Sequence, residues 1–211
     1  MPDDPDFSSP LLPPIVAILR GIRPPEIDDV AAALCEAGIG AIEIPLNSPS
    51  TWLSLQRLCK FFGTRAICGA GTVLAIADVD RVAAEGGRLI VAPNSDPRVI
   101  AHAIGLGLQM MPGFQTATEA LSAVQAGARA LKLYPAQSCP VSHLKAMRDI
   151  LPNDVGVFAV GGIDLGTIGR WIAAGAVGVG VGGALYRPGD KPELVRRRAL
   201  SLVAAFQKAM R

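Results

Sequence analysis

Short apolar runs alternate with longer segments of helical periodicity from Ile15 to the end of the chain. The short runs are rich in Val, Ile and Leu, as buried strands of a parallel sheet are. They predict eight strands, at residues 15–20, 40–44, 66–70, 88–92, 108–111, 128–133, 155–160 and 177–181. The longer segments have helix-like spacing and end near glycines, which return the chain to the next strand. After the second strand, Asn47-Ser48-Pro49 predicts a helix start with proline at the first helical position.

Eight strand-helix units in 211 residues predict an α/β fold, a single (β/α)8 or TIM barrel. The competing layout, an open doubly wound sheet, favours a G-x-G-x-x-G turn after its first strand. Here the first strand ends in Arg20 and continues as Gly21-Ile22, without that turn. We expect residues 15–211 to form the barrel domain. Residues 1–14, acidic and rich in proline, are expected to be a disordered or irregular lead-in.

Composition restricts the class of protein and its partners. Half of the residues are hydrophobic and 18% are charged, which suits a sheet covered on both faces. No apolar run reaches the roughly 20 residues needed to cross a bilayer, so no membrane partner is expected. The formal net charge of +2 is close to balance and predicts no nucleic-acid partner. The first residues lack the basic and apolar regions of a signal peptide, so we expect a cytoplasmic protein.

Neither a metal nor another cofactor is predicted. Four cysteines are spread singly, without a C-x-x-C pair, and the chain has only two histidines. No two carboxylates at strand ends pair as a divalent metal site.

Lys132 interrupts an apolar run, 129-RALKLYPA-136. One interpretation places its methylene stem along apolar surface and its ammonium in water. The other places it in a partly desolvated site, where its pKa falls and a neutral amine can attack a carbonyl as a Schiff-base nucleophile. The strand taken alone leaves both interpretations open.

Glu43 is a second charged residue in an apolar strand, between Ile42 and Ile44. It predicts either a structural ion pair with Lys132 or Arg20, or a group that moves protons beside the lysine. An imine on Lys132 would accept the electrons released when a carbon-carbon bond breaks. Aldol cleavage or addition is therefore the natural reaction class for the second interpretation.

Functional groups of a (β/α)8 barrel gather at the carboxyl ends of its strands. The polar residues predicted there are Arg20, Glu43, Thr72, Asn94 and Lys132. Glycine pairs follow the seventh and eighth strands, at Gly161-Gly162 and Gly182-Gly183, where barrels commonly bind phosphate through backbone N–H groups. A Gly-Gly pair also occurs in tight turns without a ligand, but two pairs on adjacent units favour the phosphate site.

The ordered motifs AILRGI, EIPLNSP, GAGTVL, LIVAPN, PG before T-x-T-E, ALKLYP, FAVGG and GVGVGGALYR resemble the bacterial 2-keto-3-deoxy-6-phosphogluconate/6-phosphogalactonate aldolase family from Ile15 to Arg187. The resemblance implies a trimeric, metal-independent class I aldolase with a (β/α)8 fold. It implies cleavage of a phosphorylated keto sugar acid to pyruvate and glyceraldehyde 3-phosphate.

By position, the resemblance makes Lys132 the Schiff-base lysine and Glu43 the general acid/base. It implies substrate contacts at the following strand-end residues: Arg20, Gly71, Thr72, Pro93, Val160, Gly161, Gly162, Gly182 and Gly183.

Two positions favour the phosphogalactonate branch of the family. The gluconate branch has arginine where this chain has Asn47, and threonine, tied to stereochemistry at C4, where this chain has Val160. An aldolase specific for the gluconate epimer, or one that accepts both, is the alternative. A barrel that binds a phosphosugar acid without catalysis is a more distant one.

Two departures from the family pattern affect the loops around the site. Gly183 stands where the family usually has serine, which removes one hydroxyl donor to the phosphate. Cys139-Pro140-Val141 stands where the family usually has a glycine-proline step, so the path of this loop is not predicted.

Overall fold

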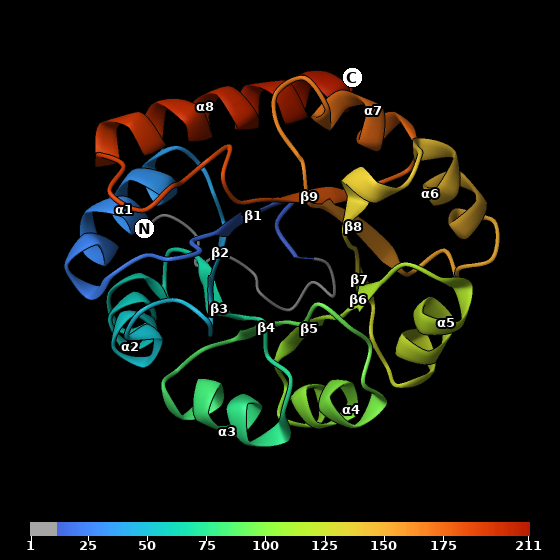
Figure 1. Cartoon of the computed structure of the whole chain (residues 1–211), viewed down its shortest axis with the longest axis horizontal. Helices are drawn as coiled ribbons and strands as arrows, with labels where there is room; N and C mark the ends of the chain where they lie inside the picture. The colour runs from blue at the N-terminus through green and yellow to red at the C-terminus, as the bar shows by residue number, and fades with distance from the viewer. Residues whose placement is uncertain (1–11) are drawn as a thin grey trace.

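The computed structural model describes residues 12–211 as a ring of parallel strands surrounded by helices (Figure 1). The strands are β1 Ile15–Ile18, β2 Ala41–Pro45, β3 Ile67–Gly71, β4 Leu89–Val91, β5 Gln109–Met111, β6 Gly113–Phe114, β7 Ala130–Leu133, β8 Gly156–Val160 and β9 Gly178–Val181. The α-helices are α1 Ile27–Glu36, α2 Thr51–Phe62, α3 Ile76–Ala84, α4 Pro97–Gly105, α5 Ala117–Gln125, α6 Val141–Arg148, α7 Ile168–Ala173 and α8 Pro192–Ala209. The 3-10 turns are η1 Pro24–Glu26 and η2 Ala136–Ser138.

Pro112 explains why the structure has nine strands where the sequence predicts eight. The strand order is β5-β4-β3-β2-β1-β9-β8-β7-β6, so β5 pairs with β4 and β6 pairs with β7 at the two ends of the sheet. Pro112 separates β5 from β6, and its carbonyl accepts a hydrogen bond of 2.8 Å from the N–H of Lys132 on β7. The fifth predicted strand therefore continues past Pro112 and brings the two ends of the sheet together. The predicted TIM-type barrel is confirmed.

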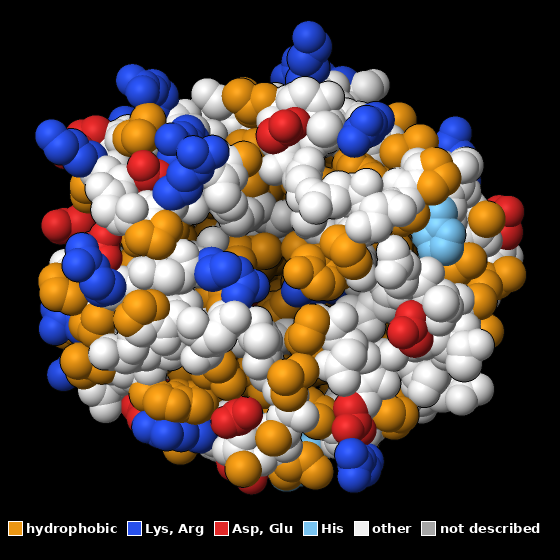
Figure 2. All heavy atoms as spheres, viewed as in Figure 1, with side chains coloured by type: hydrophobic (Ala, Val, Ile, Leu, Met, Phe, Trp, Pro, Cys, Tyr) orange, Lys and Arg blue, Asp and Glu red, His pale blue; other side chains and the backbone are white. Residues whose placement is uncertain are grey.

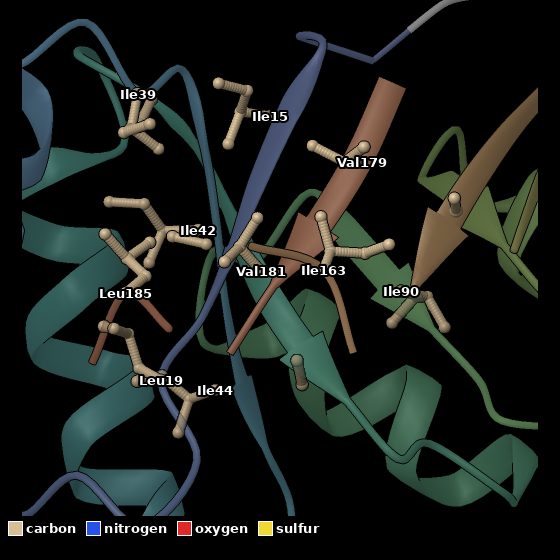
Figure 3. Close-up of a cluster of buried hydrophobic side chains, with 14 of the residues drawn as sticks. Ile15, Leu19, Ile39, Ile42, Ile44, Ile90, Ile163, Val179, Val181 and Leu185 are labelled. Atoms are coloured by element: carbon tan, nitrogen blue, oxygen red, sulfur yellow. The ribbon is translucent and has the colours of Figure 1, made fainter. Parts of the chain in front are cut away.

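Side chains from alternate strand positions form two separate hydrophobic clusters. Residues that point outward pack under the helices, and Figure 3 shows Ile15, Ile42, Val179 and Val181 among them. The residues of the inner cluster fill the barrel: Leu12, Val16, Ile18, Ala41, Ile67, Leu89, Val91, Met111, Ala130, Phe158 and Val160. Because successive strand residues face opposite sides, this inner set identifies which positions of β1, β2, β3, β4, β5, β7 and β8 point into the barrel.

The segment before β1 contributes to the barrel. Leu12 is buried in the inner cluster, and the carbonyl of Pro14 accepts a hydrogen bond of 2.8 Å from the N–H of Val179 on β9. Residues 1–11, most of the predicted lead-in, lie outside the described residues. Within residues 12–211, no helix is long and apolar enough to span a membrane.

Candidate active site

Lys132 and Glu43 lie inside the barrel, on β7 and β2. Ala130, two residues before Lys132, belongs to the inner cluster, as does Ile18, which pairs with Glu43 across the sheet. Only 6% of Lys132 and 2% of Glu43 is exposed to solvent. The burial of Lys132 excludes the interpretation in which its ammonium points into water.

The two buried groups influence each other without forming a direct ion pair. No salt bridge of 4 Å or less involves Glu43 among residues 12–211, and its Oε2 is buried without a hydrogen-bond partner. Burial raises the pKa of Glu43 to about 7, although the nearby cations Lys132 and Arg20 oppose this rise. Burial lowers the pKa of Lys132, Glu43 opposes that change, and Arg20 adds to it. At neutral pH this arrangement favours a partly protonated carboxyl beside an amine that loses its proton more readily than usual.

The aromatic ring of Tyr134 lies beside Lys132, and the sequence prediction did not include this residue in the site. The Nζ of Lys132 lies 4.5 Å from the centroid of the Tyr134 ring. Tyr134 is two residues beyond Lys132, just past the end of β7, and lines the cavity. Its spacing of two residues from Lys132 was the available sequence signal for it.

Gly71 leaves room for the carboxyl group of Glu43. A Cβ atom at Gly71 would overlap Oε2 of Glu43, so no larger residue fits while Glu43 keeps this position. Thr72 follows with a left-handed backbone, at a φ of 57°. Pro93 follows β4 closely and is half-buried, with its carbonyl close to Gly113 on β6. These three predicted residues occupy the carboxyl ends of β3 and β4.

The sequence predicts a helix start at Asn47-Ser48-Pro49, but in the structure Asn47 lies in a loop and contacts Arg20. The Nη1 of Arg20 donates a hydrogen bond of 2.6 Å to Oδ1 of Asn47. The neighbouring Ser48 accepts a hydrogen bond of 2.9 Å from the N–H of Gly21. These bonds tie the loop after β2 to the loop after β1, and α2 starts only at Thr51. The predicted helix start at Pro49 is therefore wrong by two residues.

A cavity of about 640 Å³ opens at the carboxyl ends of β1, β8 and β9. The hollow at the centre of the face in Figure 2 lies over the ring of strands in Figure 1, and Lys or Arg side chains are visible at its edge and inside it. Six predicted residues line the cavity: Arg20, Val160, Gly161, Gly162, Gly182 and Gly183. Ile18 and Tyr134 also line it; Ile18 pairs with Glu43, and the Tyr134 ring contacts the amine of Lys132. The buried amine and carboxyl therefore adjoin the inner side of this cavity.

The two glycine turns differ in how much space surrounds their glycines. Gly161 and Gly162 have φ values of 101° and 70°, and a Cβ at Gly162 would overlap the Gln137 side chain. At Gly183 a Cβ atom would have no other atom within 4 Å, so its lack of a side chain is not required by space. The N–H groups of Gly162, Gly182 and Gly183 have no hydrogen bond to another described residue and are available to an anion.

The loop after β7 forms the 3-10 turn η2 and then enters α6. Cys139 ends this turn, its N–H donating to the carbonyl of Ala136 at 3.2 Å, and α6 begins at Val141. The N–H of Gln137 donates to the carbonyl of Gly161, so this loop is joined to the first glycine turn. Within residues 12–211, no group of three His, Cys, Asp or Glu side chains is placed to hold a metal ion.

Comparison with protein families identifies the family that the sequence motifs resemble. The family described as KDPG and KHG aldolase matches residues 11–196. The chain belongs to the KDPG and KHG aldolase family. The resemblance inferred from the sequence is thereby confirmed.

Individual relatives of this aldolase-family chain are similar over nearly its whole length. The 2-dehydro-3-deoxy-6-phosphogalactonate aldolase of Escherichia coli (strain K12) is 43% identical over 197 residues, covering 93% of this chain and 96% of the relative. A solved structure described as native KDPGal has 43% identity and a TM-score of 0.92, covering 94% of this chain and 96% of the other. A cube-shaped protein cage, designed by fusing symmetric oligomeric domains, matches with 43% identity and a TM-score of 0.92 over 93% of this chain and 73% of its own.

In this member of the KDPG and KHG aldolase family, the cavity also contains residues that the sequence prediction missed. Asp164 follows the first glycine turn, and Tyr186, Arg187 and Pro188 follow the second. Asp164 Oδ1 accepts hydrogen bonds from the N–H groups of Gly166 and Thr167, at 3.0 and 2.9 Å. The position of these residues just beyond the glycine pairs was the only sequence signal for them.

Proposed function

We propose that this chain is a class I aldolase that cleaves 2-dehydro-3-deoxy-6-phosphogalactonate to pyruvate and glyceraldehyde 3-phosphate. The observation that carries the proposal is the buried pair Lys132 and Glu43, next to a cavity with two glycine turns. Burying an amine and a carboxyl is costly, and a purely binding protein gains nothing from them.

The reaction begins at Lys132. Its neutral Nζ attacks the C2 ketone of the substrate, and loss of water leaves an imine. Glu43, acting through water, takes the proton of the C4 hydroxyl, and the C3–C4 bond breaks. Its electrons enter the imine to give an enamine, and glyceraldehyde 3-phosphate leaves. Protonation of the enamine at C3 and hydrolysis of the imine release pyruvate and regenerate the lysine.

The other predicted site residues bind and orient the substrate. Gly71 and Thr72 interact with its carboxylate end, Arg20 contacts the substrate from the cavity that the glycine turns also line, and Pro93 limits the space around the reacting carbon atoms. The glycine turns bind the phosphate through their N–H groups. Arg20 is held by Asn47, which replaces the arginine of the gluconate branch and keeps the guanidinium at the rim of the cavity.

The direct test is a coupled pyruvate-release assay on both C4-epimeric phosphosugar acids with EDTA present. We expect metal-independent cleavage with a higher kcat/KM for the galactonate epimer. Equal or greater activity on the gluconate epimer would favour the alternative aldolases. Binding of either compound without pyruvate release would favour the non-catalytic barrel.

Replacing Val160 by threonine is expected to raise relative activity on the gluconate epimer. Val160 is 2% exposed and lines the cavity, and threonine has nearly the same shape but adds a hydroxyl. A new hydrogen bond to one C4 epimer is expected to change the ratio of the two kcat/KM values about 5- to 20-fold. Val160→Ala is the control, because it removes volume without adding a donor. An unchanged epimer ratio in Val160→Thr would exclude this role.

The oligomer and the compartment belong to the same proposal: a homotrimer in the cytoplasm. A trimer is implied by the family resemblance, and the similar cage was designed from symmetric oligomeric domains. Exposed apolar side chains that supply contact surface include Leu53, Phe61, Leu74 and Leu165. Light scattering should give about three times the chain mass of 21.9 kDa. A mass of one chain at micromolar concentration would contradict the trimer.

A further inference from the structure

Arg187 lies at the cavity just beyond the second glycine turn. It lines the same cavity as Gly182 and Gly183, and its side chain is exposed. Its Nε donates a hydrogen bond of 3.0 Å to the carbonyl of Gly183. Among residues 12–211, no carboxylate pairs with its guanidinium. The two terminal nitrogens of Arg187 are therefore free to bind an anion in the cavity.

The backbone of Arg187 is fixed by an acidic residue that does not neutralise the side chain. Its N–H donates to Oδ2 of Asp190 at 2.8 Å, and the N–H of Asp190 donates to its carbonyl at 2.9 Å. The same Oδ2 accepts a hydrogen bond of 2.5 Å from Arg198 on α8. Because Asp190 is paired with Arg198, the turn is anchored while the charge of Arg187 remains available.

The charges around the cavity favour an anion at this end. Arg20 and Arg187 line it together with one carboxylate, Asp164. The Oδ1 of Asp164 already accepts two backbone hydrogen bonds within its own loop. A guanidinium with two free nitrogens matches the geometry of a phosphate, which it can bind through two parallel hydrogen bonds.

We propose that Arg187 binds the phosphate of the substrate together with the N–H groups of Gly182 and Gly183. It supplies the contact that is lost because residue 183 has no hydroxyl. The bond from Nε to the Gly183 carbonyl places the guanidinium directly beside the turn where that hydroxyl would be. This inference rests on the proposed aldolase function and adds the group that recognises the phosphate.

The test compares the phosphorylated substrate with 2-dehydro-3-deoxygalactonate, which lacks the phosphate. For Arg187→Ala we expect KM for the phosphorylated substrate to rise about 10- to 100-fold with kcat little changed. The kcat/KM for the unphosphorylated compound should stay within about twofold. Arg196→Ala is the matched control, since Arg196 pairs with Glu36 on α1 at 3.3 Å and its replacement removes the same charge elsewhere. An equal loss on both substrates would overturn the proposal.

Serine at position 183 provides a second, independent measurement. Nothing lies within 4 Å of a Cβ there, so Gly183→Ser should fold normally. In the Arg187→Ala background it should recover part of the lost affinity for the phosphorylated substrate, whereas Gly183→Ala should recover none. Stabilisation of the protein by inorganic phosphate, measured as a rise in Tm, should fall in Arg187→Ala. If the wild type cleaves neither compound, the aldolase proposal fails, and unchanged phosphate stabilisation in Arg187→Ala would separately overturn the role of Arg187.

Discussion

Replacing Lys132 with methionine should abolish cleavage of the phosphogalactonate substrate, with kcat/KM falling at least about 10⁴-fold. Without the amine no imine forms, and the electrons of the C3–C4 bond have no acceptor. Methionine has a similar length and suits a side chain that is 6% exposed, so the barrel should remain folded. The coupled pyruvate-release assay measures the loss, and circular dichroism verifies the fold. Retention of more than about 1% of wild-type activity would exclude Lys132 as the nucleophile.

Trapping with pyruvate and borohydride identifies the residue that reacts. Reduction converts the imine to a stable secondary amine, so the peptide containing Lys132 should gain the mass of the reduced pyruvate adduct. The other lysines, Lys60, Lys145, Lys191 and Lys208, are exposed and serve as internal controls in the same digest. Their amines are in water, away from the cavity, and should remain unmodified under the same conditions. An adduct spread evenly over all lysines would show that burial does not select Lys132.

The sequence was sufficient for the barrel because its parallel strands leave a strong local signal. Runs such as 155–160 are apolar throughout, since one face packs against helices and the other fills the barrel. Lys132 and Glu43 could also be recognised in the sequence, because charged residues are unusual in such apolar runs. Strand periodicity then places them inside, where the structure finds them.

Contacts between distant loops could not be predicted in the same way. The hydrogen bond from Arg20 to Asn47 joins residues 27 positions apart, and it takes Asn47 away from the helix cap that its type suggests. The predicted fifth strand ends before Pro112, but the short strand β6 beyond it was not predicted, because β6 is defined by its pairing with β7 where the two ends of the sheet meet. Arg187 was missed because an exposed arginine after a turn resembles any solvated residue. Its free guanidinium is evident only when the pairing of Asp190 with Arg198 is known.

Glu43→Gln should reduce kcat/KM about 10²- to 10⁴-fold, the usual contribution of a positioned general acid/base, and should change its pH dependence. Burial raises the pKa of Glu43 to about 7, so in the wild type the carboxylate that accepts the C4 hydroxyl proton is lost as pH falls through 7. Wild-type kcat/KM should therefore fall about tenfold per pH unit on the acid side. Glutamine cannot ionise, so this acid limb should be absent from the residual activity, and rate measurements between about pH 5 and 9 check it.

Glu43→Gln should also change the pKa of Lys132, and this change should favour imine formation rather than prevent it. The carboxylate of Glu43 raises the pKa of Lys132 against the effect of burial, so its removal should lower that pKa further and leave more neutral amine at neutral pH. Glu43→Gln should accordingly still form the borohydride-trapped pyruvate adduct, and should do so at lower pH than the wild type, although it cleaves the sugar acid slowly. Glu43→Asp is the control that retains an ionisable group, and the acid limb should return in it. If Glu43→Gln lost adduct formation together with cleavage, Glu43 would be required to activate or hold Lys132, and its assignment to the C4 hydroxyl proton would be wrong.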